Sequence, residues 1–150
     1  MADKTDAALL RELADREAIR DLPRAYAHHV WQRNIREIAD LFTEDGVMDT
    51  PDMDPLVGRE TIFEAYVKML NDDEFHPFIH NHFIELDGDR ATGTVYLDLR
   101  ATVNGKDLLS SGVYDDVYER VDGTWKFSSR KVTMGRFYLL RAPKSSEQTG

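Results

Sequence analysis

Apolar residues recur at helical spacing over the first part of the chain. Between Asp6 and Trp31 they stand at positions 10, 13, 14, 19, 22, 26 and 30, which predicts a long helix. Pro23 lacks a backbone donor and should kink or split it. A second helix is predicted to begin after Asn34, whose side chain can cap free backbone amides, and to end near residue 42. A third is predicted over residues 59–70, with positions 62, 65, 66, 69 and 70 on one face.

The pattern then changes to strand-like runs. Gly46 and the stretch 50–55 predict a loop between the second and third helices. After residue 74, the dipeptides Asp-Gly at 87, Asn-Gly at 104 and Asp-Gly at 122 favour hairpins. Four antiparallel strands follow, near 77–86, 90–103, 107–121 and 124–138. The order predicts an α+β fold, with about three N-terminal helices packed on a strongly curved antiparallel sheet to form a cone-shaped barrel. Its open end is a natural pocket for a small molecule.

Composition narrows the class of protein. The 150 residues show neither a linker nor a repeat, which predicts one domain over 1–150, with an ordered core from about 8 to 140 and a loose tail at 142–150. A net charge of -9 argues against binding to nucleic acid or to an anionic membrane. Without cysteine there are no disulfides or thiolate ligands. We find no signal-peptide pattern or spanning apolar run, and therefore expect a cytoplasmic protein.

Three of the five histidines lie within seven positions, at His76, His80 and His82. Side chains alternate along a strand, and the even positions of this strand, including Ile84, form the apolar set. His80 and His82 are therefore predicted to face the helices, whereas Pro77 makes the same extrapolation to His76 unsafe. Such imidazoles can transfer protons or bind substrate, can hold a metal as a His-x-His pair, or can be hydrogen-bonded core residues.

The second predicted strand alternates between apolar residues and residues with polar groups. Its odd positions are apolar and point inward, so Tyr96, Asp98 and Arg100 are predicted to point outward, toward solvent or a partner subunit. Helices cover only one face of such a sheet. We therefore expect the other face to support a homodimer or a higher homo-oligomer.

Several segments, in this order, resemble the SnoaL-like branch of the nuclear-transport-factor-2-like superfamily. They are "REAIRDLPRAYAHHVWQRNIREIADLFTEDGVM", "GRETI", "IELDGDRATG" and "SGVYDDVYERVDGTWKFSSR", within a match that covers about residues 8 to 138. This superfamily includes dehydratases, ketosteroid isomerase, polyketide cyclases and a dehydrochlorinase. The resemblance implies a cone fold, a deep apolar pocket and proton-transfer chemistry on a cyclic or aromatic substrate.

The resemblance also implies a catalytic pair, in which a histidine base on the first long strand is supported by an aspartate near the end of the first helix. Without a gap the histidine position falls on His76, and with a one-residue gap it falls on His80. The aspartate position falls on Trp31. An imidazole that lacks a carboxylate partner is not oriented, and its protonated form is not stabilised.

The resemblance also implies that five further residues could contact the substrate. On the first helix these are Tyr26, His29 and Trp31, the last as part of an apolar wall. On the sheet, Tyr114 could offer a hydroxyl, and Arg130 could hold a carboxylate or fix a subunit contact.

Three functions remain open at this point. The first is a cofactor-free lyase or isomerase of the dehydratase type, with one of the three histidines as base and acid and Tyr114 or Tyr26 polarising a substrate oxygen. The second is a non-catalytic module, for a small apolar ligand or a partner, that has lost the aspartate. The third is a metal enzyme. Because the resemblance implies no metal, we expect neither a metal nor another cofactor.

Overall fold

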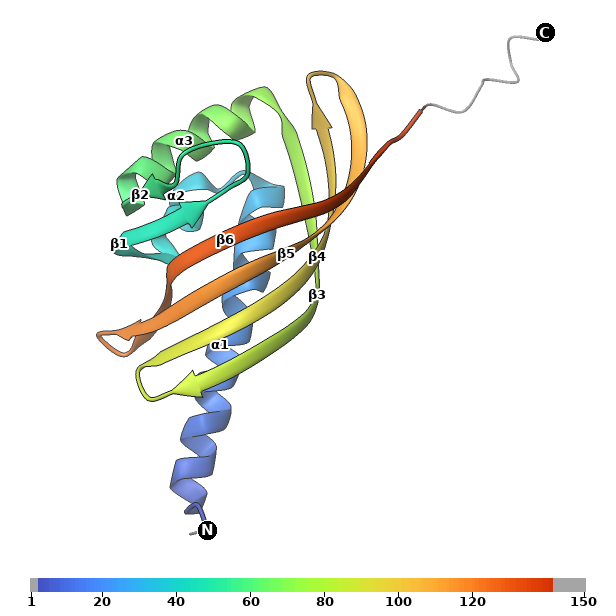
Figure 1. Ribbon diagram of the computed structural model, residues 1–150. Coiled ribbons are helices and arrows are strands. Elements are labelled where there is room, and N and C mark those ends of the chain that lie inside the picture. The colour runs from blue at the N-terminus through green and yellow to red at the C-terminus, as the bar shows by residue number, and fades with distance from the viewer. Residues whose placement is uncertain (1–2, 142–150) are drawn as a thin grey trace, which may run out of the picture.

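The computed structural model describes residues 3–141, which fold into helices packed in the hollow of a bent sheet (Figure 1). In chain order the elements are α1 (Asp6–Gln32), α2 (Ile35–Asp40), β1 (Phe42–Asp49), β2 (Leu56–Val57), α3 (Arg59–Asp72), β3 (Glu74–Asp87), β4 (Arg90–Val103), β5 (Lys106–Val121) and β6 (Thr124–Leu139). The strands form one open sheet in the order β2-β1-β6-β5-β4-β3. The predicted α+β cone is confirmed. The loose tail predicted at 142–150 lies outside the described residues.

The long first helix is continuous over nearly its predicted range. Thr5 begins it by accepting a hydrogen bond from the backbone N–H of Ala8, and Arg33 ends it in the left-handed conformation. Pro23 lies inside α1 with its ring fully buried, and the helix is not split there. The second helix does begin after Asn34, but that side chain makes no capping bond.

Two strands were missed, β1 and the two-residue β2. β1 lies where a loop was predicted and pairs in parallel with β6, Phe42 opposite Phe127, so the sheet is mixed rather than wholly antiparallel. Its sequence, "FTEDGVMD", shows no clear alternation of apolar and polar residues, and Gly46 is typical of a turn. The other four strands follow the predicted order, and their hairpin turns contain residues with positive φ.

A β-bulge divides β3 into two halves. Ile79 pairs with Leu97, and the next pair is His82 with Val95, so β3 holds one extra residue between them. An extra residue reverses which side chains face the core. The alternation predicted across this strand therefore holds after the bulge, and fails before it.

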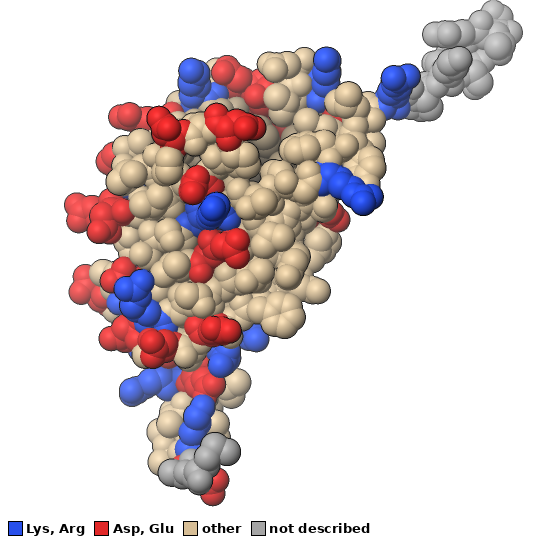
Figure 2. Space-filling model, viewed as in Figure 1, with Lys and Arg blue, Asp and Glu red and all other residues tan. Residues whose placement is uncertain are grey.

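Part of the outer face of the sheet is uncharged. Figure 2 shows an area without Lys, Arg, Asp or Glu over part of the strands, with charged residues beside it. Tyr96 and Arg100 are exposed on this face, and Asp98 is partly exposed there, as predicted. In the part of the chain that is described, no helix is long and apolar enough to cross a membrane.

Gly93 on β4 makes room for two side chains at the narrow end of the cone. A Cβ at this position would lie 2.6 Å from the Tyr118 hydroxyl and 2.9 Å from His82 Nε2. We expect Gly93→Ala to lower the free energy of unfolding by about 1–3 kcal/mol, because overpacking forces these groups apart. Urea unfolding measures the change.

Thr92→Ala, an exposed change on the same strand, is the control and should stay within about 0.5 kcal/mol of the unchanged protein. If Gly93→Ala were as stable as this control, the close packing at Gly93 would be refuted.

Candidate functional site: an apolar pocket with three tyrosines

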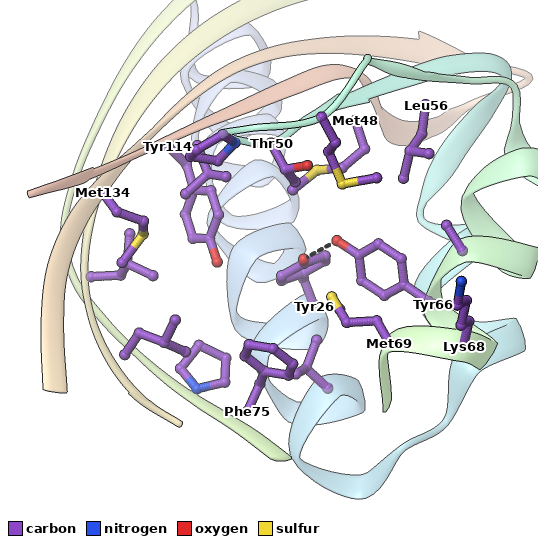
Figure 3. A pocket seen from close by; sticks show the side chains of 18 of the residues that line it. Tyr26, Met48, Thr50, Leu56, Tyr66, Lys68, Met69, Phe75, Tyr114 and Met134 are labelled. Atoms are coloured by element: carbon purple, nitrogen blue, oxygen red, sulfur yellow. Dashed lines mark hydrogen bonds between the residues drawn. The ribbon is translucent and has the colours of Figure 1, made fainter. Parts of the chain in front are cut away.

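A cavity of about 510 Å³ opens between α1, α3, the end of β1 and the concave face of the sheet (Figure 3). Its volume lies within the range typical of small-molecule sites. Most of its wall is apolar, with Val30 from α1, Phe75 from β3, Leu97 from β4 and Val132 from β6. The pocket predicted at the open end of the cone is therefore present.

Three tyrosine side chains line this cavity, together with Thr50, whose hydroxyl is buried. The hydroxyl of Tyr26 on α1 is hydrogen-bonded to the hydroxyl of Tyr66 on α3, and both point into the cavity (Figure 3). Tyr114 on β5 lies edge-on to Tyr26, with ring centroids 5.9 Å apart. Burial raises the pKa of each phenol well above its ordinary value. All three are therefore neutral at physiological pH. Tyr114, and whichever of Tyr26 and Tyr66 accepts the bond between them, can each donate a hydrogen bond to a ligand oxygen.

A buried ion pair lies behind two of these tyrosines. Arg130 donates from Nε to Asp116 Oδ1 at 2.8 Å and from Nη2 to Oδ2 at 3.0 Å, and both side chains are fully buried. The guanidinium lies 3.6 Å from the ring centroid of Tyr114 and 4.6 Å from that of Tyr26. Burial acts to lower the pKa of Arg130, but the charge of Asp116 outweighs it and the pKa lies above its ordinary value. Arg130 therefore binds the carboxylate of Asp116, where the sequence had suggested the carboxylate of a ligand.

His82 extends this network toward β3. Tyr118 donates to Asp116 Oδ2 at 2.9 Å, and His82 Nε2 lies 2.9 Å from the Tyr118 hydroxyl. Because the single hydroxyl proton goes to the carboxylate, His82 Nε2 must carry the proton of the second bond. Burial lowers the pKa of His82 to about 4, so the imidazole is neutral. His82 faces the core, as predicted, but does not line the cavity.

The predicted position of a histidine–aspartate pair holds a stack of rings. Trp31 and His76 lie parallel with centroids 3.8 Å apart, and Trp31 Nε1 donates to the Pro77 carbonyl at 2.8 Å. His76 Nε2 lies 3.0 Å from Glu74 Oε1. It is Pro77 and Phe75, the neighbours of His76, that line the cavity. Trp31 was predicted to form part of the pocket wall; it does not line the pocket, because its indole lies against the backbone and His76 of β3.

Two other predicted histidines also lie away from the cavity. His80 was predicted to face inward, and this is wrong: the bulge turns it to the outer face, where its Nε2 lies 3.0 Å from Asp98 Oδ2 and half of the side chain is exposed. His29 is near the end of α1, and its Nδ1 atom lies 3.1 Å from the side-chain nitrogen of Asn34. Of the predicted contact residues, Tyr26 and Tyr114 line the pocket.

Sequence reasoning missed several residues of the pocket. Tyr66 and Met69 come from the apolar face of α3, which the helical spacing identified without indicating a ligand. Lys68 and Asp72 are the charged lining residues, and both come from the same helix. Within residues 3–141 no group of three or more His, Asp or Glu side chains is placed to hold a metal ion.

An open cone with helices in its hollow and an apolar cavity at its wide end defines a class of small-molecule pocket proteins. A family model described as the SnoaL-like domain matches residues 11–131. The chain belongs to this SnoaL-like family, within the nuclear-transport-factor-2-like superfamily.

Individual relatives agree with the family. A gamma-hexachlorocyclohexane dehydrochlorinase of Sphingobium indicum is 28% identical over 137 residues, covering 87% of each chain. The crystal structure of a type 2 hexachlorocyclohexane dehydrochlorinase has a TM-score of 0.83 at 26% identity, covering 90% of this chain and 97% of that one. A scytalone dehydratase-like protein of Novosphingobium aromaticivorans has a TM-score of 0.78 at 20% identity, covering 87% and 91%, which shows the fold alone. The similarity to the dehydrochlorinases supports a general assignment of the chain to the lyase-type pocket proteins.

The lowered pKa of His82 makes stability depend on pH. Below about pH 6.5 the unfolded chain takes up a proton on this residue, whereas the folded protein does so only near pH 4. The free energy of unfolding should therefore fall as the pH is lowered through this window. Urea unfolding midpoints measured from about pH 7 to pH 4.5 report the slope.

His82→Gln keeps an N–H donor for Tyr118 but cannot titrate, and should flatten the slope. His80→Gln, on the exposed outer face, is the matched control and should keep it. An unchanged slope in His82→Gln would show that another group is responsible.

Proposed function

We propose that this protein is a cofactor-free lyase or isomerase that acts on a compact, apolar ring compound bearing an oxygen. The observation that carries the proposal is the gathering of three tyrosine hydroxyls in a cavity that is otherwise mostly apolar. The apolar wall would bind the ring, and the hydroxyls would bind the oxygen. The dehydrochlorinase relatives support elimination chemistry in such a cavity.

The tyrosines would supply the electrophilic part of the reaction. Removing a proton next to a carbonyl places negative charge on the oxygen, and hydrogen-bond donors already pointing at that oxygen stabilise the charge. Tyr114 is best placed for this role, since its hydroxyl points into the cavity while the Arg130 guanidinium lies against its ring (Figure 3). Burial raises the pKa of this phenol, and the positive charge behind the ring offsets part of that rise.

A proton acceptor is also required. Asp72, at the end of α3, is the carboxylate among the lining residues and is our candidate for this base. Catalysis by His76, His80 or His82 stays a prediction from the sequence, because none of the three lines the cavity. Alanine substitution of each, with Asp72→Asn in parallel, separates the two assignments once turnover is measured.

A second function, ligand binding without catalysis, is favoured by one observation. The ring stack of Trp31 on His76 occupies the place where the family resemblance implies a base and its carboxylate. A pocket that keeps its walls and its hydrogen-bond donors but lacks that pair would bind a ligand and release it unchanged.

Binding is tested with two ligands of the same skeleton. 2-Tetralone carries a ketone, whereas tetralin lacks it. We expect Tyr114→Phe to weaken binding of 2-tetralone about tenfold, as loss of one hydrogen bond predicts, and to leave tetralin unaffected. Isothermal titration calorimetry measures both affinities.

Tyr138→Phe, a change of the same kind at an exposed tyrosine of β6, is the control and should alter neither affinity. Equal affinity for the ketone and the hydrocarbon in the unchanged protein would refute the proposed role of the hydroxyls.

Exchange of hydrogen next to the ketone separates catalysis from simple binding. In D₂O an enzyme that removes this proton accelerates deuterium uptake by 2-tetralone above the buffer rate, which NMR detects. Acceleration that Tyr114→Phe reduces would support the lyase or isomerase. Tight binding without acceleration would favour the second function.

We also propose that copies of the chain associate through the outer face of the sheet. Part of this face is uncharged, and Tyr96 is exposed on it, in a protein whose net charge is -9 (Figure 2). Light scattering should show a dimer or a larger homo-oligomer, and Tyr96→Lys should shift it toward the monomer. The control is Val121→Lys, an exposed apolar position at the end of β5. A monomer at working concentration in the unchanged protein would contradict the proposal.

A further inference from the structure

Methionines are concentrated in the pocket. The whole chain contains five, and four of them line the cavity: Met48, Met53, Met69 and Met134. They come from β1, the loop before β2, α3 and β6, so the thioethers reach the cavity from different sides. Figure 3 shows Met69 and Met134 on separate walls, with their sulfur atoms beside the cavity.

The sheet is shaped to hold one of these side chains. Gly112 on β5 lies next to Met134 on β6, and a Cβ at Gly112 would lie 2.8 Å from the Met134 sulfur. Met48 is 2% exposed. Met134 and Met48 are therefore closely packed in the cavity wall, whereas Met53 is 51% exposed.

Thioethers distinguish between kinds of ring. Sulfur is polarizable and makes favourable contacts with an aromatic ring, usually at its edge, which a saturated ring does not offer. A methionine that only fills a gap in a closed core has no such consequence. Here Met53, Met69 and Met134 border about 510 Å³ of open space and are at least partly exposed, so a ligand can meet these three directly.

We infer that the ligand of this pocket contains a planar aromatic ring, and that the methionine wall selects it over a saturated ring of the same skeleton. The inference rests on the proposed function, because the tyrosines would still hold the oxygen of the ligand. It adds that the ring bound by the apolar wall is aromatic. Methionine side chains are also flexible, which lets the wall adapt to differently substituted aromatic rings.

The test compares 2-naphthol with trans-decahydro-2-naphthol, which share a skeleton and a hydroxyl but differ in aromaticity. Calorimetry should give about tenfold tighter binding of the aromatic alcohol, as several sulfur–aromatic contacts predict. Replacing both Met69 and Met134 with leucine keeps the volume and removes two thioethers. This double variant should lose about threefold to tenfold of the preference, through weaker binding of 2-naphthol.

Two variants serve as controls. Leu22→Met makes the reverse exchange at a buried position that does not line the pocket, and should leave the preference unchanged. Leu99→Met adds a thioether to the cavity wall and should increase the preference. Met69→Leu alone provides a milder change if the double variant unfolds.

The outcomes separate this inference from the proposed function. If both alcohols bind and the Met→Leu variants keep the full preference for 2-naphthol, the methionine wall does not select the ring and the inference is overturned alone. If neither alcohol nor 2-tetralone binds, both the proposed function and this inference are refuted. A preference that falls in the double variant and rises in Leu99→Met would establish the inference.

Discussion

The cone depends on the buried pair of Arg130 and Asp116. These residues lie opposite each other on β6 and β5, and their two hydrogen bonds leave neither charge exposed. Tyr26 from α1 lies over the guanidinium, and Tyr118 links the carboxylate to β3 through His82. Removing one partner of such a pair costs about 3–5 kcal/mol, a large part of the 5–15 kcal/mol that typically stabilises a protein. The helix and the sheet are thus held together around one buried pair of opposite charges.

This arrangement divides the interior of the cone into two parts. At the narrow end every polar side chain named above is engaged with another, and Gly93 leaves just enough space for them. At the wide end the wall is apolar and open. Tyr26 and Tyr114 form the boundary, since each ring lies against Arg130 while its side chain also lines the cavity. A fixed charge can therefore act on the pocket without being exposed to a ligand.

Much of this could be predicted from the sequence, for physical reasons that differ between elements. The hairpins of β3 to β6 follow from turn pairs that tolerate positive φ, and Tyr26 and Tyr114 were identified as pocket residues from the family resemblance. β1 could not be predicted, because a parallel strand beside β6 is fixed by distant contacts and its own sequence shows no alternation. The methionine wall was also missed, because residues far apart in sequence acquire a shared role only when the fold brings them around one cavity.

The bulge in β3 has a consequence beyond this chain. The extra residue between Ile79 and His82 lets both halves of the strand keep their pairing with β4, so His80 and His82, two positions apart, lie on opposite faces of the sheet. If the extra residue lay before His80 instead, His80 would share the inward face of His82. The position of a bulge can thus add or withdraw an imidazole without changing any amino-acid type. Alignments of this family that place a histidine by counting through this strand depend on where the bulge lies in each protein.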